Sequence, residues 1–158
     1  MRIALIFTTR SLFLYTIFII SACGLFENEQ TIDSTGTVFG TWELEEIRYD
    51  NGETLTPDSN DPYWFELKED SVFAEQEYHY SLEGQSFCNP CFGYFDHNEE
   101  DQSINISFIC GRLACGIAAE FASAVATSIQ YSFSKGNLNL FFETAIEGKG
   151  RIILNSKQ

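Results

Sequence analysis

Short runs of alternating apolar and polar residues recur from about Gly40 to the C-terminus, and this alternation most limits how the chain folds. In the first run, Trp42 and Leu44 alternate with Glu43 and Glu45. A period of two places successive side chains on opposite faces of an extended strand, so each run predicts a half-buried β-strand. Aromatic residues make up 15% of the chain, and their rings pack well on pleated sheets. The sequence therefore predicts a mostly β domain.

Turn residues separate the later runs, as at Asp50-Asn51-Gly52 and at Ser134-Lys135-Gly136-Asn137, and the second of these predicts a β-hairpin. The third run is predicted to be one strand, with Glu75, Glu77 and His79 on its wet face. The positions predicted to share a face in the later runs are Tyr63, Phe65 and Leu67; Ala74, Gln76, Tyr78, Tyr80 and Leu82; Ile104, Ile106, Phe108 and Cys110; Tyr131 and Phe133; Leu138, Leu140 and Phe142.

One stretch departs from this pattern. Ile117, Phe121 and then Ala124 or Val125 recur three or four residues apart in an alanine-rich segment. This spacing predicts one helix at about residues 116–130, packed on the sheet.

The N-terminus has the layout of an export signal. Arg2 and Arg10 precede an apolar run from Leu12 to Ile20, which is too short to span a bilayer. We therefore expect residues 1–22 to be a signal peptide, removed from a mature chain that functions outside the cytoplasm.

Ile20-Ser21-Ala22-Cys23 is similar to the lipobox of bacterial lipoproteins. The similarity implies cleavage before Cys23 and acylation of that cysteine, and several acyl chains make a durable membrane anchor. Gly24, rather than Asp, follows the cysteine, which by the lipoprotein sorting rule favours the outer membrane. The alternative is an ordinary secretory signal that leaves Cys23 as a free thiol. Residues 23–37 are expected to be a flexible linker, and residues 38–158 the folded domain.

The chain is strongly acidic. It has 9 Lys and Arg residues against 23 Asp and Glu residues, a net charge of −14. Such a surface repels phosphate backbones and anionic lipid headgroups. The charge therefore argues against nucleic acid as a partner and leaves the lipid as the expected contact with the membrane.

Four further cysteines follow Cys23, at Cys88, Cys91, Cys110 and Cys115. Their spacing is compatible with two disulfides, with a four-cysteine zinc site, or with a redox-active pair at Cys88 and Cys91. An exported domain meets an oxidising environment, so disulfides are favoured over the other two interpretations. Of the three connectivities, we favour Cys88–Cys115 with Cys91–Cys110, which nests one loop within the other. We expect no metal and no cofactor.

Two motifs around these cysteines carry a family resemblance. The segment 88–94 (Cys-Asn-Pro-Cys-Phe-Gly-Tyr) resembles the Cys-Asn-x-x-x-Gly-x-Tyr signature of META (HslJ-like) domains, and the segment 111–115 stands where that family has Thr-x-Met-Ala-Cys. Three positions depart from the pattern: Gly111 replaces the family's Thr, Tyr94 comes one residue before the family's usual aromatic, and the extra pair Cys91 and Cys110 is foreign to the signature. The matched positions are Cys88, Asn89, Gly93, Tyr94, Leu113, Ala114, Cys115 and Glu120.

The resemblance covers about Val38 to Leu154. It implies an α+β domain: a compact, partly barrel-like antiparallel sheet with one packed helix, common in envelope lipoproteins and linked to stress resistance. The family has no agreed catalytic activity.

Two clusters of polar residues are candidate sites. The acidic run from Asp96 to Asp101 lacks the glycine and glutamate positions of an EF-hand loop, so we interpret it as a solvated loop. Glu75, Glu77 and His79 alternate along one strand face, which is more typical of an exposed sheet face than of a carboxylate–histidine site. The sequence thus has no convincing catalytic set.

The leading hypothesis is a non-enzymatic, monomeric, lipid-anchored envelope protein that acts in stress tolerance or through contacts with an envelope protein. The alternative is a lipocalin-like binder of a small apolar ligand, because Gly40-Thr41-Trp42 also resembles the Gly-x-Trp opening of lipocalins. We expect the helix to argue against the alternative, since it interrupts the strands where an eight-stranded barrel would continue.

Overall fold

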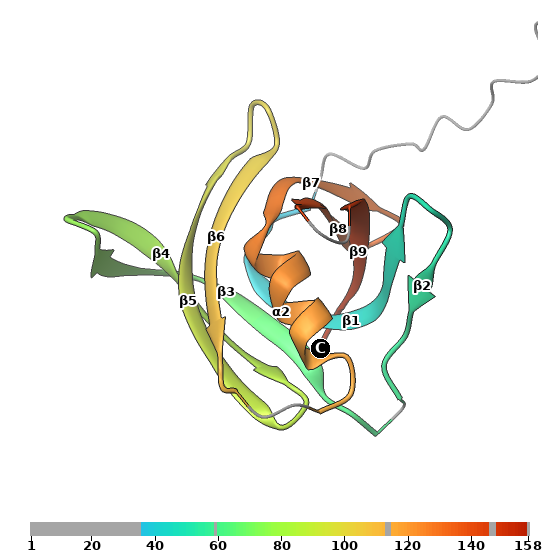
Figure 1. Ribbon diagram of the computed structural model, residues 1–158. Helices are drawn as coiled ribbons and strands as arrows, with labels where there is room; N and C mark the ends of the chain where they lie inside the picture. The colour runs from blue at the N-terminus through green and yellow to red at the C-terminus, as the bar shows by residue number, and fades with distance from the viewer. Residues whose placement is uncertain (1–35, 59, 113–114, 146–147, 158) are drawn as a thin grey trace, which may run out of the picture. The chain divides into compact units, whose positions relative to one another are not determined.

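The structure, a computed structural model, describes residues 36–58, 60–112, 115–145 and 148–157. The predicted signal peptide, Cys23 and most of the predicted linker lie outside these ranges. The described residues form nine strands and one helix (Figure 1). In chain order these are β1 (Gly40–Tyr49), β2 (Thr54–Leu55), β3 (Tyr63–Ala74), β4 (Glu77–Ser86), β5 (Asn89–Asn98), β6 (Ser103–Cys110), α2 (Ala118–Ala126), β7 (Ser128–Ser134), β8 (Asn137–Thr144) and β9 (Gly148–Ser156).

Eight of these strands close into an antiparallel β-barrel (Figure 1). From β3 onward each strand pairs with the next along the chain, and β1 pairs with both β3 and β9. The two-residue β2 is added to the end of β1. The mostly β, barrel-like fold predicted for the chain is therefore confirmed.

A β-bulge in β1 keeps its apolar side chains inside the barrel. Opposite β9, Leu44 pairs with Leu154 but Glu46 pairs with Ile153, so Glu45 is an extra residue. The bulge moves the buried positions of β1 from even residue numbers to odd ones, with Ile47 buried.

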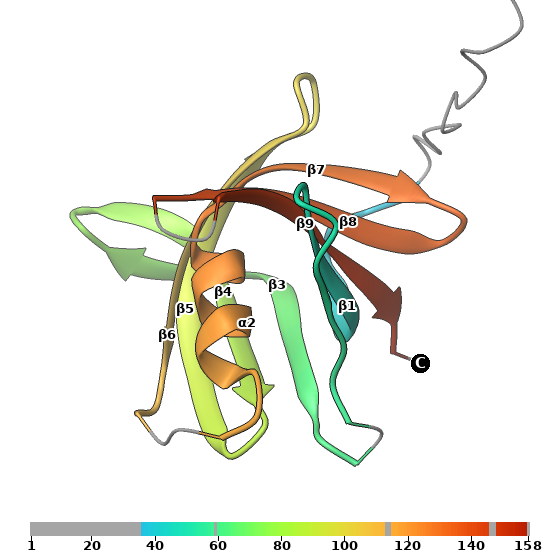
Figure 2. The same ribbon diagram turned by 45° about the vertical axis from the view of Figure 1, so that its right-hand side comes forward.

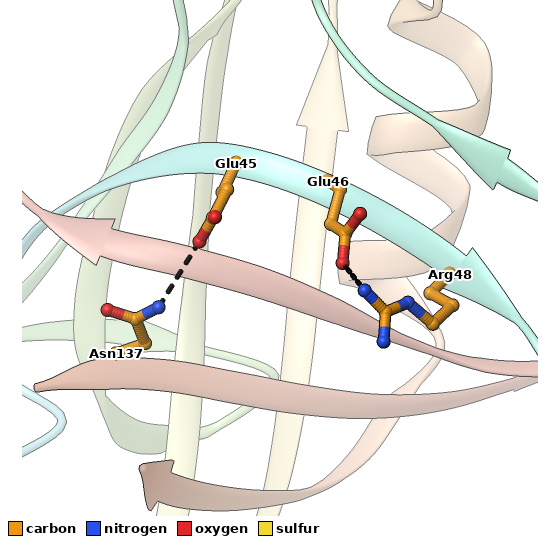
Figure 3. Close-up of polar contacts among 4 residues, drawn as sticks. All are labelled: Glu45, Glu46, Arg48 and Asn137. Carbon is orange, nitrogen blue, oxygen red and sulfur yellow. Dashed lines mark hydrogen bonds and ion pairs between the residues drawn. The ribbon is translucent and has the colours of Figure 1, made fainter. Parts of the chain in front are cut away.

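Polar contacts surround this bulge (Figure 3). The Glu45 carboxylate accepts a hydrogen bond of 3.2 Å from the Asn137 side chain of β8, and Glu46 pairs with Arg48 on β1 itself. The side chain of the bulged residue Glu45 thus reaches across β9 and links β1 directly to β8.

The helix is shorter than the sequence predicts. It spans Ala118–Ala126, whereas helical spacing predicted about 116–130. Thr127 ends it with its backbone N–H and its hydroxyl both bonded to the Ser123 carbonyl, and Ser128 already begins β7 opposite Phe142. Pairing with β8 therefore replaces the last predicted turns of the helix. No described helix is long and apolar enough to cross a membrane.

Helix α2 packs against β6 and β8 and contributes Phe121 to the barrel core (Figure 2). The Phe121 ring lies 6.3 Å from that of Phe65 and 6.0 Å from that of Phe108, centroid to centroid. Phe121 is fully buried, and so are Val125 and Leu140. The end of the barrel beside α2 is filled by side chains.

The third predicted strand is wrong, because the chain reverses within it. Glu75 and Gln76 have φ values of 49° and 75° and form the two-residue turn between β3 and β4. Two positive φ values suit a tight hairpin turn, although these residue types seldom signal one. The result is a long β3–β4 hairpin that projects beyond the body of the barrel (green in Figures 1 and 2).

Candidate functional site

Two disulfides hold the end of the barrel beside α2. Cys88 in the β4–β5 turn is joined to Cys115, just before α2, with their Cα atoms 6.4 Å apart. Cys91 and Cys110, directly opposite each other on β5 and β6, form the second bridge, with a Cα–Cα distance of 4.1 Å. This is the connectivity that the nested arrangement favours. The first bridge fastens the β4–β5 turn to the β6–α2 connection, and the second joins β5 to β6.

Side chains from the neighbouring strands fix where α2 begins. The Tyr63 hydroxyl accepts a 3.0 Å hydrogen bond from the Ile117 N–H and lies 3.4 Å from the Cys115 carbonyl. Ser86 donates a 3.2 Å hydrogen bond to the Ala118 carbonyl. Burial raises the pKa of the Tyr63 hydroxyl, so it stays protonated and able to donate. This cluster has the character of a scaffold rather than of a reactive centre.

The residues that carry the family resemblance lie around the same end. Asn89 is buried, and its side-chain amide is 3.6 Å from the sulfur of Cys115. Gly93 is needed for close strand approach, because a Cβ there would lie 1.8 Å from the Ser107 carbonyl oxygen. Tyr94 faces outward on β5, and Glu120 lies half-buried on α2. Leu113 and Ala114 are outside the described residues.

A cleft of about 570 Å³ borders α2 at this end. Small residues and one cysteine of each disulfide, Cys110 and Cys115, form most of its lining, with Arg112 and Glu120 as its charged side chains.

The predicted carboxylate–histidine face is rearranged by the β3–β4 turn. His79 Nδ1 lies 2.7 Å from Asp96 Oδ2 of β5, and its ring packs on Tyr94 with 4.7 Å between centroids. Glu75 hydrogen-bonds the Tyr94 hydroxyl, which raises the pKa of that phenol. The hydrogen bond to Asp96 likewise raises the pKa of His79. Glu77 acts on His79 only through its charge.

These contacts brace the hairpin against β5 from outside the barrel. Within the described ranges, no group of three or more His, Cys, Asp or Glu side chains could hold a metal. The acidic run also has a structural role. Residues 96–98 form the end of β5, and the Asp101 carboxylate in the following turn accepts a 2.9 Å hydrogen bond from the Ser103 N–H. Hydrogen bonds from Ser103 lower the pKa of Asp101.

Aromatic rings line the other end of the barrel. Phe39 lies 5.0 Å from Tyr80 and 5.2 Å from His97, and Tyr80 lies 5.6 Å from His97, all between ring centroids. Phe95 and Tyr131 form the buried base of this group. Nδ1 of His97 is buried and has no hydrogen-bond partner within the described residues. No helix covers this group in the part of the chain that the structure describes.

The aromatic surface continues onto the projecting hairpin. Tyr80 pairs with Ser71 and Tyr78 pairs with Phe73, so Tyr78 and Phe73 lie on the same inner face as Tyr80. The rings of Phe73 and Tyr78 are 5.2 Å apart, and the two side chains are 63% and 75% exposed. We call the inner-face residues Phe39, Phe73, Tyr78, Tyr80 and His97 the aromatic stripe.

Alternation in the sequence does not predict the aromatic stripe as a unit. In an unbroken strand Phe73 and Tyr78 would lie on opposite faces, and only the turn at residues 75 and 76 brings them together. The sequence holds only a weak signal for this turn. The nearest aromatic residues lie at an odd position before Glu75 and Gln76 and at even positions after them.

Comparisons with known proteins do not place this chain in a family. No protein-family model matches the chain, and no curated protein matches it. Among solved structures, a DUF4847 family protein from Bacteroides vulgatus ATCC 8482 matches with 18% sequence identity and a TM-score of 0.49. The match covers 75% of this chain and 94% of that one.

Proposed function

We propose that this chain is a non-enzymatic binding protein of the cell envelope, anchored by lipid at Cys23, which engages an envelope partner through the aromatic stripe. One observation carries the binding role. Along a single inner sheet face, the exposed fraction rises from 0% at Phe95 to 37% at Tyr80 and 75% at Tyr78. Continuous exposed aromatic surface of this kind is uncommon on soluble monomers and marks interaction sites.

Two features support an envelope setting. Disulfides persist outside the reducing cytoplasm, and this domain has two of them in about 120 residues. The lipobox-like tetrad that ends at Cys23 supplies the proposed anchor, and the Gly24 that follows it favours the outer membrane. Membership of the META (HslJ-like) family, with its link to envelope stress, remains part of this proposal.

The alternative, a lipocalin-like binder of a small apolar ligand, gains support from the closed eight-stranded barrel. The expected objection to it was wrong, because α2 lies in the β6–β7 connection and the barrel still closes. The packing of Phe121 against Phe65 and Phe108 fills the barrel interior beside α2, although a cleft borders the helix on its outside. A small ligand bound inside the barrel would therefore also have to enter at the aromatic stripe.

In-cell photo-crosslinking tests the binding role. A photoreactive phenylalanine analogue is placed at Tyr78 of the full chain and, as a control, at Phe92, which is 63% exposed on the outer face of β5. We expect one discrete protein adduct from position 78 and none from position 92. Equal labelling at both positions, or none, contradicts the proposal, while an adduct with the mass of a small molecule favours the alternative.

Metabolic labelling with an alkyne fatty acid tests the anchor separately. We expect label on the wild-type chain and on a Ser21→Ala control, and none on Cys23→Ser, which should also leave the membrane fraction. Label retained by Cys23→Ser would overturn anchoring at this residue.

A further inference from the structure

We infer that the aromatic stripe docks an extended polypeptide segment in which apolar and basic residues alternate, added beside the outer part of β3. This rests on the proposed function, because it names the chemistry of the partner for the same surface. Three observations carry it: the exposed aromatic pair, the charges around that pair, and an unpaired strand edge.

The charges on the hairpin are almost all negative. Glu69, Asp70, Glu75 and Glu77 are exposed and lie within four residues of Phe73 or Tyr78 in the sequence, and we call these four residues the acidic rim. Lys68 is the single Lys or Arg of the hairpin, and it is already paired with Glu83 at 2.7 Å and Glu66 at 3.6 Å. No ion pair in the described part of the chain engages Glu69, Asp70 or Glu77. The acidic rim therefore suits Lys and Arg side chains and repels anionic lipid headgroups.

The backbone beside the stripe is open on one side. Pairing between β1 and β3 ends at Gly40 opposite Leu67, whereas Ser71–Ala74 pair with β4 alone. No described strand covers the other edge of Ser71–Ala74. Such an edge can accept an added strand through main-chain hydrogen bonds.

An added strand beside β3 would present its side chains alternately to the two sheet faces. Residues on the inner face would meet Phe73 and Tyr78, which favour apolar side chains. Residues on the outer face would share that face with Glu77, which lies on β4 opposite Ala74, two residues before the outward-facing His79. The expected recognition pattern is therefore apolar and basic in alternation.

Acidic residues at a free edge can also serve only to prevent pairing with other chains. That role explains Glu69 and Asp70, but it does not explain the aromatic pair, since exposed Phe73 and Tyr78 beside an open edge would promote association. A surface that combines both features fits selective docking better than protection.

The test uses a defined probe, the capped peptide Lys-Phe-Lys-Val-Lys-Phe-Lys, titrated into the mature chain by isothermal calorimetry. We expect saturable one-to-one binding that weakens several-fold between about 50 and 300 mM salt. The double variant Phe73→Ser/Tyr78→Ser should bind at least about tenfold more weakly, as the loss of two anchor rings implies. The control Phe92→Ser should bind as the wild type does, and circular dichroism verifies that each variant is folded.

Charge is tested on its own with Glu69→Lys against Glu53→Lys, an equal change at an exposed site in the loop after β1. We expect several-fold weaker binding for the first variant and little change for the second. A peptide with Pro in place of its central Val should lose binding, because Pro removes a donor from the added strand.

The outcomes separate the two proposals. If a Glu-based peptide binds as tightly as the Lys-based one, and Phe73→Ser/Tyr78→Ser abolishes both, the aromatic stripe still binds and the inferred basic partner is overturned. If the Pro peptide binds unchanged, strand addition is overturned. If the Lys peptide does not bind while position 78 still crosslinks in cells, this inference is overturned and the proposed function stands. If the peptide does not bind and position 78 gives no crosslink, both the inference and the proposed function are overturned.

Discussion

The two ends of the barrel use the same inner sheet face in opposite ways. Beside α2, Phe65 and Phe108 are covered by Phe121, the Cys88–Cys115 bridge fastens the segment before α2 to the β4–β5 turn, and Cys91–Cys110 joins β5 to β6. At the other end, the inner face runs on past the barrel wall and leaves Tyr78 and Phe73 in solvent. Similar apolar side chains thus form a covered core beside α2 and, at the other end, the exposed surface that we propose to bind a partner.

Truncating one ring at each end should give the largest contrast. We expect Phe121→Ala to lower the free energy of unfolding by about 3–5 kcal/mol, the usual cost of removing a buried phenylalanine. Phe73→Ala should change it by less than about 0.5 kcal/mol, because an exposed ring loses few contacts. Urea denaturation of both variants measures the difference, and equal effects would erase the distinction between the two ends.

The Cys88–Cys115 bridge should rank next. Replacing both cysteines by alanine should cost about 3 kcal/mol on the chain-entropy model, since the bridge joins residues 27 apart in sequence. Amide exchange should rise in α2 and stay unchanged in the β3–β4 hairpin. Faster exchange in the hairpin would mean that the two ends are not independent.

The Tyr63 hydroxyl should contribute a smaller share. Tyr63→Phe keeps the ring but leaves the Ile117 N–H without its 3.0 Å acceptor, which should cost about 1–2 kcal/mol. A matched change at the aromatic end, Tyr80→Phe, should have a smaller effect on thermal unfolding. A larger effect of Tyr80→Phe would contradict the assignment of the stabilising polar contacts to the end beside α2.

The smallest effect should be the pH dependence of the hairpin. The Asp96 hydrogen bond raises the pKa of His79 above 6.5, so the contribution of this pair is fully present below pH 6.5 and is lost as pH rises through the raised value. We expect the difference in hairpin amide protection between wild type and His79→Gln to be larger at pH 5.5 than at pH 8.5. A difference that grows with pH would have the wrong sign.

The sequence predicts the barrel well because its strands have one wet and one buried face. Trp42, Leu44, Phe65 and Ile106 are buried as alternation predicts, and the hairpin turn at residues 134–137 is confirmed. Burial of one face fixes the register of such strands, so a local pattern is enough to identify them.

The aromatic end could not be predicted, because the burial that fixes the other strands is missing there. The hairpin beyond the barrel wall has little core to pack on, so its residues carry no clear pattern of buried and exposed faces. The turn at Glu75 and Gln76 also lacks the Asn-Gly type of signal that marks two positive φ values. The contact of His79 with Asp96 depends on that turn, and so it escaped prediction as well.

Hydroxyl-radical footprinting tests the central claim most directly, by comparing the full chain in intact cells with the purified protein. If the aromatic stripe is the functional surface, Phe73 and Tyr78 should be oxidised readily in the purified protein and protected in cells. Phe92, as exposed as Phe73, should react equally in both. Equal oxidation of Phe73 and Tyr78 in cells and in the purified protein would contradict the claim that this surface is occupied in the envelope.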